Sequence, residues 1–240
     1  MTANMVVRAD PEDLARHVAE WLIERIGEHP GKVRIALSGG STPKRLFQLL
    51  ATDEYSKRVP WRRVHLFWGD ERFVPADHPD SNYGMTRAAL LGKVPLPETN
   101  IHPIPTDGAP DEAAARYERL LQNEYGAMAF DPARPLFDAT FLGLGEDGHT
   151  ASLLPGDPVL EERRRWVAAV AHGRPEARIT LTYPALESSR AVAFLVSGAG
   201  KADILRSVRS GQADLPAAHV QPNGELIWFV DRAAAGGSSA

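Results

Sequence analysis

The chain has 240 residues, of which 43% are hydrophobic and 24% charged, a composition typical of a globular protein with a packed core. Its formal net charge of −4 argues against a general nucleic-acid-binding or anionic-membrane surface, so an anionic ligand would have to meet a local basic cluster. The absence of cysteine excludes disulfides, thiolate catalysis and sulfur-bound zinc and fits a reducing compartment such as the cytoplasm, and no apolar run predicts a membrane span or a secretory signal.

The first half of the chain alternates patterns typical of strands and helices. Asp10 and Pro11 predict the start of the first helix, because aspartate caps helices well and proline suits the first helical position. Apolar residues then recur at helical spacing, and Gly31 follows the last turn. The expected elements are, in order, a strand at Met5–Ala9, this first helix, a strand at Val33–Leu37, a helix at Lys44–Leu50, a strand at Val64–Trp68, a helix at Asn82–Leu90, a strand at Ile101–Ile104 and a helix at Asp111–Tyr125.

The second half continues the alternation. Its expected elements are strands at Ala139–Leu142, Trp166–Val170, Ile179–Tyr183, Ala191–Val196 and Leu226–Val230, a short helix opened by Pro184, and a helix that follows Lys201 and runs to about Val208. Strands that alternate with helices predict an α/β fold in which a mainly parallel sheet has helices on both faces. Neither an internal repeat nor a linker divides the chain, so we expect one domain over residues 1–232 and a disordered tail of small and polar residues at 233–240.

Glycine-rich and charged clusters follow four of the expected strands, at residues 38–42, 69–72, 143–149 and 197–201. In open α/β sheets, ligands bind beyond the carboxyl ends of the strands. We therefore expect these four loops to share one rim of the sheet, although they lie far apart in the sequence.

The first of these clusters, Ser38–Pro43, stands immediately before a helix. Free backbone N–H groups and the helix dipole would favour a phosphate there, and the hydroxyls of Ser41 and Thr42 add donors. An ordinary strand-to-helix turn with a hydroxyl cap is an equally good interpretation of this loop alone. The loop lacks the spacing of a Walker A motif.

The third cluster contains Gly143–Gly148, which matches the Gly-x-Gly-x-x-Gly pattern of dinucleotide-binding folds, but its context does not fit. The segment Pro155–Pro158 breaks the helix that should follow, and no acidic residue ends the next strand. The glycines are better explained by a tight turn that presents Asp147 and His149 at the rim. A lone loop histidine is usually a surface residue, but the neighbouring Asp147 and the more distant Asp70 favour a catalytic role for His149.

The remaining charged candidates are less distinctive. Asp70, Glu71 and Arg72 follow a buried strand directly, and as exposed ion pairs they would add little stability. Arg178 and Lys201 begin a strand and a helix, and each alone fits an ordinary surface residue. The sequence contains no His-Glu-x-x-His motif and no tight cluster of histidine and aspartate, so we expect no metal site.

Six stretches of the sequence, taken together, resemble one enzyme family. They are Leu37–Pro43, Trp68–Arg72, Ser81–Tyr83, Gly143–Leu153, Arg178–Thr182 and Gly198–Lys201. In this order they are similar to the 6-phosphogluconolactonase family, within the larger group of sugar-phosphate enzymes that includes glucosamine-6-phosphate deaminase. The resemblance runs from about residue 5 to 232. Its Asp-Gly-His-Thr-Ala-Ser-Leu run is highly specific, whereas the Gly-Gly-Ser-Thr-Pro loop is shared across the wider group.

The resemblance implies a single Rossmann-like α/β/α domain that hydrolyses 6-phospho-D-glucono-1,5-lactone to 6-phospho-D-gluconate in the oxidative pentose phosphate pathway, without metal or cofactor. His149 would act first as base and then as acid. The small-molecule substrate is the only partner that these observations predict, and the oligomeric state stays open. The implied site comprises a phosphate pocket of Gly39, Gly40, Ser41, Thr42, Arg178 and Lys201, and a catalytic pair of Asp147 and His149 with Asp70 and Arg72 nearby.

Two alternatives stay open. A deaminase or isomerase on the same scaffold would use the same pocket for different chemistry; deaminases carry a glutamate five residues after the histidine, where this chain has Leu154. A sugar-phosphate sensor would bind without turnover, but such sensors usually carry an attached DNA-binding or partner domain. The presence of Asp147 and His149 also argues against a silent binder. Hydrolysis of the lactone is therefore the preferred hypothesis.

Overall fold

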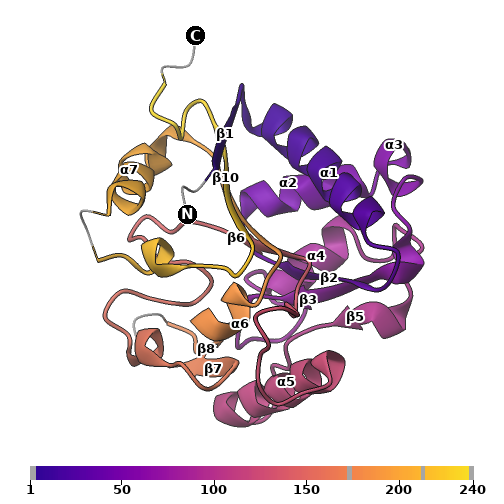
Figure 1. Cartoon of the computed structure of the whole chain (residues 1–240), viewed down its shortest axis with the longest axis vertical. Helices are drawn as coiled ribbons and strands as arrows, with labels where there is room; N and C mark the ends of the chain where they lie inside the picture. Colours follow the sequence, from indigo (N-terminus) through magenta and orange to yellow (C-terminus); the bar gives the residue numbers. More distant parts are fainter. Residues whose placement is uncertain (1–3, 172–174, 212–213, 238–240) are drawn as a thin grey trace.

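The main element of the computed structural model, which describes residues 4–171, 175–211 and 214–237, is a seven-stranded sheet with the strand order β1-β10-β9-β6-β2-β3-β5 (Figure 1). Every pair of neighbouring strands in it is parallel. The prediction of a mainly parallel α/β fold is therefore confirmed. The strands are β1 (Asn4–Arg8), β2 (Val33–Leu37), β3 (Val64–Trp68), β5 (Ile101–His102), β6 (Ala139–Leu142), β9 (Ala191–Val196) and β10 (Glu225–Asp231).

Helices cover both faces of this sheet (Figure 1). Helices α1 (Pro11–Glu28) and α2 (Ser41–Leu50) pack against each other on one side, and α5 (Pro110–Tyr125) and α6 (Tyr183–Glu187) lie on the other. Asp10 caps α1 as predicted, because its Oδ1 accepts the N–H groups of both Glu12 and Asp13 at 2.9 Å. Within the described ranges, no helix has both the length and the apolarity to cross a membrane. The other helices are α3 (Asp53–Ser56), α4 (Asn82–Ala89) and α7 (Ala202–Ser210).

Three strands form a second, antiparallel sheet that the sequence did not predict as a separate unit. Its order is β4 (Asp70–Arg72), β8 (Arg178–Leu181) and β7 (Val167–Val170). We expected Asp70–Arg72 in a loop, and that expectation is wrong, because a partner strand more than a hundred residues away holds this short polar segment extended. Gly69 joins the two sheets: its N–H donates to the Leu37 carbonyl, and its own carbonyl accepts the N–H of Leu181, both at 2.8 Å.

The element boundaries differ from the prediction at two places that matter. Helix α2 begins at Ser41 instead of Lys44, directly after Gly40, whose φ of 103° lets the chain turn into the helix. Residues 233–237, expected in a disordered tail, form turns in which Ala234 is buried and donates its N–H to Asp231. The rest of that expected tail lies outside the described residues. All other strand ends and the remaining helix ends lie within two residues of the predicted ones.

A continuous apolar core spans both sheets, which favours the prediction of one domain. At the end of β3 nearest the second sheet, the Trp68 side chain is fully buried. The hydroxyl of Tyr117 in α5 accepts the backbone N–H of Trp68 at 2.9 Å and donates to the backbone carbonyl of Trp68 at 3.1 Å. Burial raises the pKa of Tyr117, which therefore stays neutral. The core thus fixes the point from which Gly69 and Asp70 leave the main sheet.

Candidate active site

The carboxyl ends of β2, β3, β6 and β9 surround one cavity of about 280 Å³. All four predicted loops line it, so the expectation that they share one rim is confirmed. Asn82, Ala151 and Arg178 also line the cavity. The segments that follow the strands contribute Ser38–Pro43 after β2, Asp70 and Arg72 of β4 after β3, Gly143–Gly145 and His149 after β6, and Ser197 and Lys201 after β9.

The N-terminal end of α2 faces this cavity. Gly39, Gly40, Ser41 and Thr42, which the resemblance assigns to a phosphate, all line it. The first N–H groups of a helix lack intrahelical partners, so those of Ser41 and Thr42 are oriented to receive an anion. The hydroxyl of Thr42 is hydrogen-bonded to that of Ser197 at 2.7 Å, which ties this loop to the one after β9.

Three basic side chains line the same cavity: Arg72, Arg178 and Lys201. Arg72 and Arg178 are direct cross-strand partners in the β4–β8 pair, so both arginines come from one face of the second sheet. Lys201 belongs to the loop after β9, which Asp231 fixes by accepting the Gly198 N–H on both carboxylate oxygens, at 3.0 and 3.1 Å. A protein with a net negative charge therefore gathers positive charge at this cavity.

His149 and Asp147 form a hydrogen-bonded pair at the end of the loop after β6. Oδ1 of Asp147 contacts Nδ1 of the ring and also accepts the backbone N–H of His149 at 3.2 Å. A Cβ at Gly145 would clash with both side chains of the pair, so any larger residue there would have to displace them. Since Asp147 engages Nδ1, proton exchange between the histidine and a ligand would use Nε2.

Asp70 lines the cavity with its carboxylate fixed on both oxygens, and the residue is only 6% exposed. Ser152 donates its hydroxyl to Oδ2 at 2.7 Å, and Asn82 donates its amide to the Asp70 backbone carbonyl at 2.9 Å and to Oδ1 at 3.4 Å. Sequence reasoning did not select Asn82 or Ser152 as site residues. Both lie inside the stretches that resemble the family, which is the signal that could have found them.

Glu71, the middle residue of the charged trio, points away from the cavity, as the alternation along a strand requires. Its carboxylate accepts N–H groups from Arg72 at 2.8 Å and from Asn82 and Tyr83 at 2.7 Å, and the hydroxyl of Ser81 at 3.1 Å. Burial raises the pKa of Glu71 although these donors oppose the shift. Glu71 therefore anchors the start of α4, which carries Asn82, and does not reach a ligand.

Comparisons with known proteins agree with one another. Residues 9–228 match the family described as glucosamine-6-phosphate isomerases/6-phosphogluconolactonase. The chain is 45% identical to a 6-phosphogluconolactonase of Synechocystis sp. over 208 residues, which cover 85% of this chain and 84% of that protein. It is 37% identical to a 6-phosphogluconolactonase of Rattus norvegicus, covering 95% of this chain and 91% of that one. The crystal structure of 6-phosphogluconolactonase from Thermotoga maritima superposes with a TM-score of 0.81 at 28% identity, covering 95% of this chain and 99% of that one.

Proposed function

The chain belongs to the glucosamine-6-phosphate isomerase/6-phosphogluconolactonase family, on its 6-phosphogluconolactonase branch, and we propose that it hydrolyses 6-phospho-D-glucono-1,5-lactone to 6-phospho-D-gluconate. The observation that carries this proposal is the presence, in one cavity, of an aspartate-bound histidine and a basic cluster at a helix N-terminus. The first supplies acid–base chemistry, and the second holds a phosphate.

The phosphate lies at the N-terminal end of α2. Gly39 and Gly40 leave the backbone accessible there, and Ser41 and Thr42 donate N–H and hydroxyl hydrogen bonds to the phosphate oxygens. Arg178 and Lys201 neutralise its charge through charged hydrogen bonds, which are stronger than neutral ones. The lactone ring is thereby placed against the loop that carries His149.

The chemical step needs a base, a donor for the oxyanion and an acid. A water molecule attacks the lactone carbonyl carbon while Nε2 of His149 takes its proton. When the tetrahedral intermediate collapses, the bond from that carbon to the ring oxygen breaks, and the imidazolium returns the proton to the ring oxygen. Asp147 orients the imidazole and stabilises its positive charge. Arg72 stabilises the oxyanion, and Asp70 accepts a hydrogen bond from a sugar hydroxyl.

We further propose that the reaction needs no metal ion and no cofactor. The described lining of the cavity offers one histidine and one carboxylate, Asp70, and this carboxylate is already engaged by Ser152 and Asn82. Water activation by a histidine and charge stabilisation by arginine supply what a Lewis acid would otherwise provide. A cytoplasmic location, expected from the sequence, and a place in the oxidative pentose phosphate pathway go with this proposal.

A rival within the family is deamination of glucosamine 6-phosphate. The glutamate that deaminases place five residues after the histidine is replaced by Leu154, a buried side chain that cannot transfer a proton. Hydrolysis of a lactone expels no amine and needs only the proton shuttle of His149. The position of Leu154 therefore favours the lactonase over the deaminase.

The test is a stopped assay with freshly made 6-phosphoglucono-δ-lactone, corrected for its spontaneous hydrolysis, run beside an ammonia assay with glucosamine 6-phosphate. We expect fast hydrolysis of the lactone and no ammonia. Ammonia released at a rate comparable to lactone hydrolysis would refute the assignment, and so would a lactone rate equal to the spontaneous one.

A further inference from the structure

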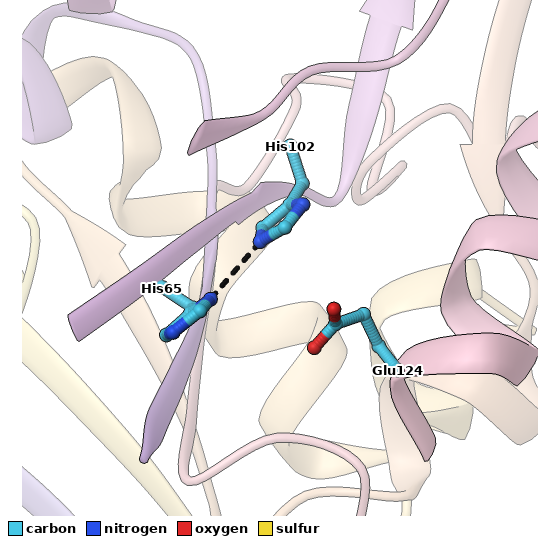
Figure 2. A group of neighbouring side chains, drawn as sticks. All are labelled: His65, His102 and Glu124. Carbon is cyan, nitrogen blue, oxygen red and sulfur yellow. Dashed lines mark hydrogen bonds between the residues drawn. The ribbon is translucent and has the colours of Figure 1, made fainter. Parts of the chain in front are cut away.

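Two histidines and a glutamate converge at the β5 edge of the main sheet, away from the cavity described above. His65 lies in β3, His102 in the neighbouring strand β5, and Glu124 in the last turn of α5 (Figure 2). His65 Nδ1 and His102 Nε2 are 3.0 Å apart. One nitrogen of each ring and one oxygen of Glu124 all lie within 4.8 Å of one another. We call these three residues the edge cluster.

The fold determines this convergence. The parallel register pairs Phe67 with His102, and the His102 ring stacks on that of Phe67 at 4.5 Å, which fixes its plane. The His65 ring lies nearly parallel to the His102 ring, at 11°. Arg34 of β2 holds the end of α5 in place by donating from Nη2 to the Glu124 carbonyl at 2.9 Å. The rings and the carboxylate are therefore positioned by backbone and packing, as a ligand site requires.

The protonation states of the edge cluster suit a cation. Burial lowers the pKa of His65 to about 4, with help from the charge of Lys32, and burial also lowers the pKa of His102. Both rings are therefore neutral at pH 7 and have a lone pair to offer. Burial on its own would raise the pKa of Glu124, but the hydrogen bond and charge of Lys32 outweigh it and lower the pKa, so the carboxylate is ionised.

One cation already competes for the edge cluster. Lys32 Nζ lies 2.8 Å from Glu124 Oε2, and Arg34 Nε lies 3.9 Å from the same oxygen. The Lys32 side chain is 38% exposed and stands at the protein surface, so it can turn into solvent when another cation takes its place. The salt bridge of Lys32 is to Oε2 of Glu124, so the other carboxylate oxygen, Oε1, can bind a cation without Lys32 having to leave.

We propose that His65, His102 and Glu124 bind one Zn²⁺ ion, with water as the remaining ligand. Two imidazoles and one carboxylate are an established three-residue donor set for this ion. None of the three lines the active-site cavity, and His65 lies near the start of β3, whereas the cavity residues Asp70 and Arg72 follow its end. The ion would join β3, the edge strand β5 and the end of α5, so we assign it to stability and not to the reaction.

The test is a titration of Zn²⁺ into the metal-stripped full-length chain, followed by calorimetry and by thermal unfolding. We expect a binding event of one ion per chain and, at saturation, a rise in Tm of about 5 °C. His65→Ala, His102→Gln and Glu124→Gln should each weaken this event at least about 100-fold. Lys32→Ala should tighten it by up to about fivefold, the strength of a partly exposed ion pair.

The matched control is His78→Ala, which removes an exposed histidine outside the edge cluster and should leave the binding event unchanged. Circular dichroism establishes that each variant is folded, and Lys32→Ala tests the site without removing a ligand. Zinc that binds wild type and the three ligand variants equally would overturn the proposal. Zinc binding that inhibits lactone hydrolysis and is lost only with the His149–Asp147 pair would overturn it as well.

Discussion

The active-site cavity and the edge cluster use the same parallel sheet in opposite ways. The cavity is built from loops that follow the strands, and its groups are charged and hydrogen-bonded: His149 to Asp147, Asp70 to Ser152. The edge cluster lies on regular elements, and packing keeps its imidazoles neutral. Charge gathered at the strand ends suits the capture and turnover of a small anion, whereas neutral imidazoles on strands beside a carboxylate on a helix suit a cation that stays bound.

The largest expected effect is on kcat, which should depend on the active-site cavity and not on the edge cluster. His149→Ala should lower kcat by roughly two to four orders of magnitude, because it removes the only described histidine of the cavity, while binding of 6-phosphogluconate is retained. Steady-state kinetics and calorimetry of product binding measure the two quantities.

His65→Ala is the matched control for this substitution, since it changes a histidine of the edge cluster and should leave kcat close to that of wild type. A folded His149→Ala variant with near-normal kcat would contradict the assignment of the base.

The next effect tests the positive charge of the cavity. Arg178→Ala and Lys201→Ala should each cost roughly 1.5 to 3 kcal/mol in binding of the phosphorylated substrate, because each removes a charged hydrogen bond. Inhibition by 6-phosphogluconate gives the binding free energy. Arg206→Ala, which removes an exposed arginine outside the cavity, should have no effect.

Unphosphorylated gluconolactone, used as a second substrate, tests whether Arg178 and Lys201 act on the phosphate group. It should be a poor substrate of wild type, and the two substitutions should change its turnover much less. Equal losses for both lactones would mean that Arg178 and Lys201 do not hold the phosphate.

The smallest effect concerns the edge cluster and its pH dependence. Burial holds the pKa of His65 at about 4, against about 6.5 in the unfolded chain, so between these values the unfolded chain binds more protons. Stability is therefore full above pH 6.5 and falls as the pH drops towards 4. Complete burial would make this loss about 3 kcal/mol, and the partial exposure of the ring reduces it to about 1 kcal/mol.

Urea unfolding in the presence of a chelator, between pH 4 and 7, measures this loss. His65→Gln should flatten the pH dependence relative to wild type, whereas His78→Gln should not. An identical pH dependence in wild type and His65→Gln would show that the ring is not kept neutral by the fold.

The cavity could be predicted from the sequence because its residues lie next to recognisable local patterns, namely the glycine-rich and charged runs that follow apolar strands. Each loop follows an apolar strand, and a glycine, proline or charged run marks where the strand ends, so Ser38–Pro43 and the turn before His149 were located correctly. The second sheet was missed for the opposite reason. The three residues of β4 have no apolar alternation, and only their pairing with β8 makes them a strand and brings Arg72 beside Arg178.

The edge cluster shows the same limit more strongly. His65, His102 and Glu124 are isolated in sequence, so no motif or His/Asp cluster marked them, and the expectation of no metal site stays a prediction that the zinc titration tests. Their convergence depends on the register of β3 with β5 and on the position of the end of α5, neither of which is readable from spacing.

The central claim is that the cavity at the strand ends hydrolyses the phosphorylated lactone by itself, without an ion. It is tested most directly by the initial rate of 6-phosphogluconolactone hydrolysis, corrected for the spontaneous reaction, before and after exhaustive treatment of the protein with a chelator. We predict that the rate is unchanged, even where removal of bound Zn²⁺ lowers Tm. A rate that falls to the spontaneous level and returns when one divalent ion is added back would contradict the account.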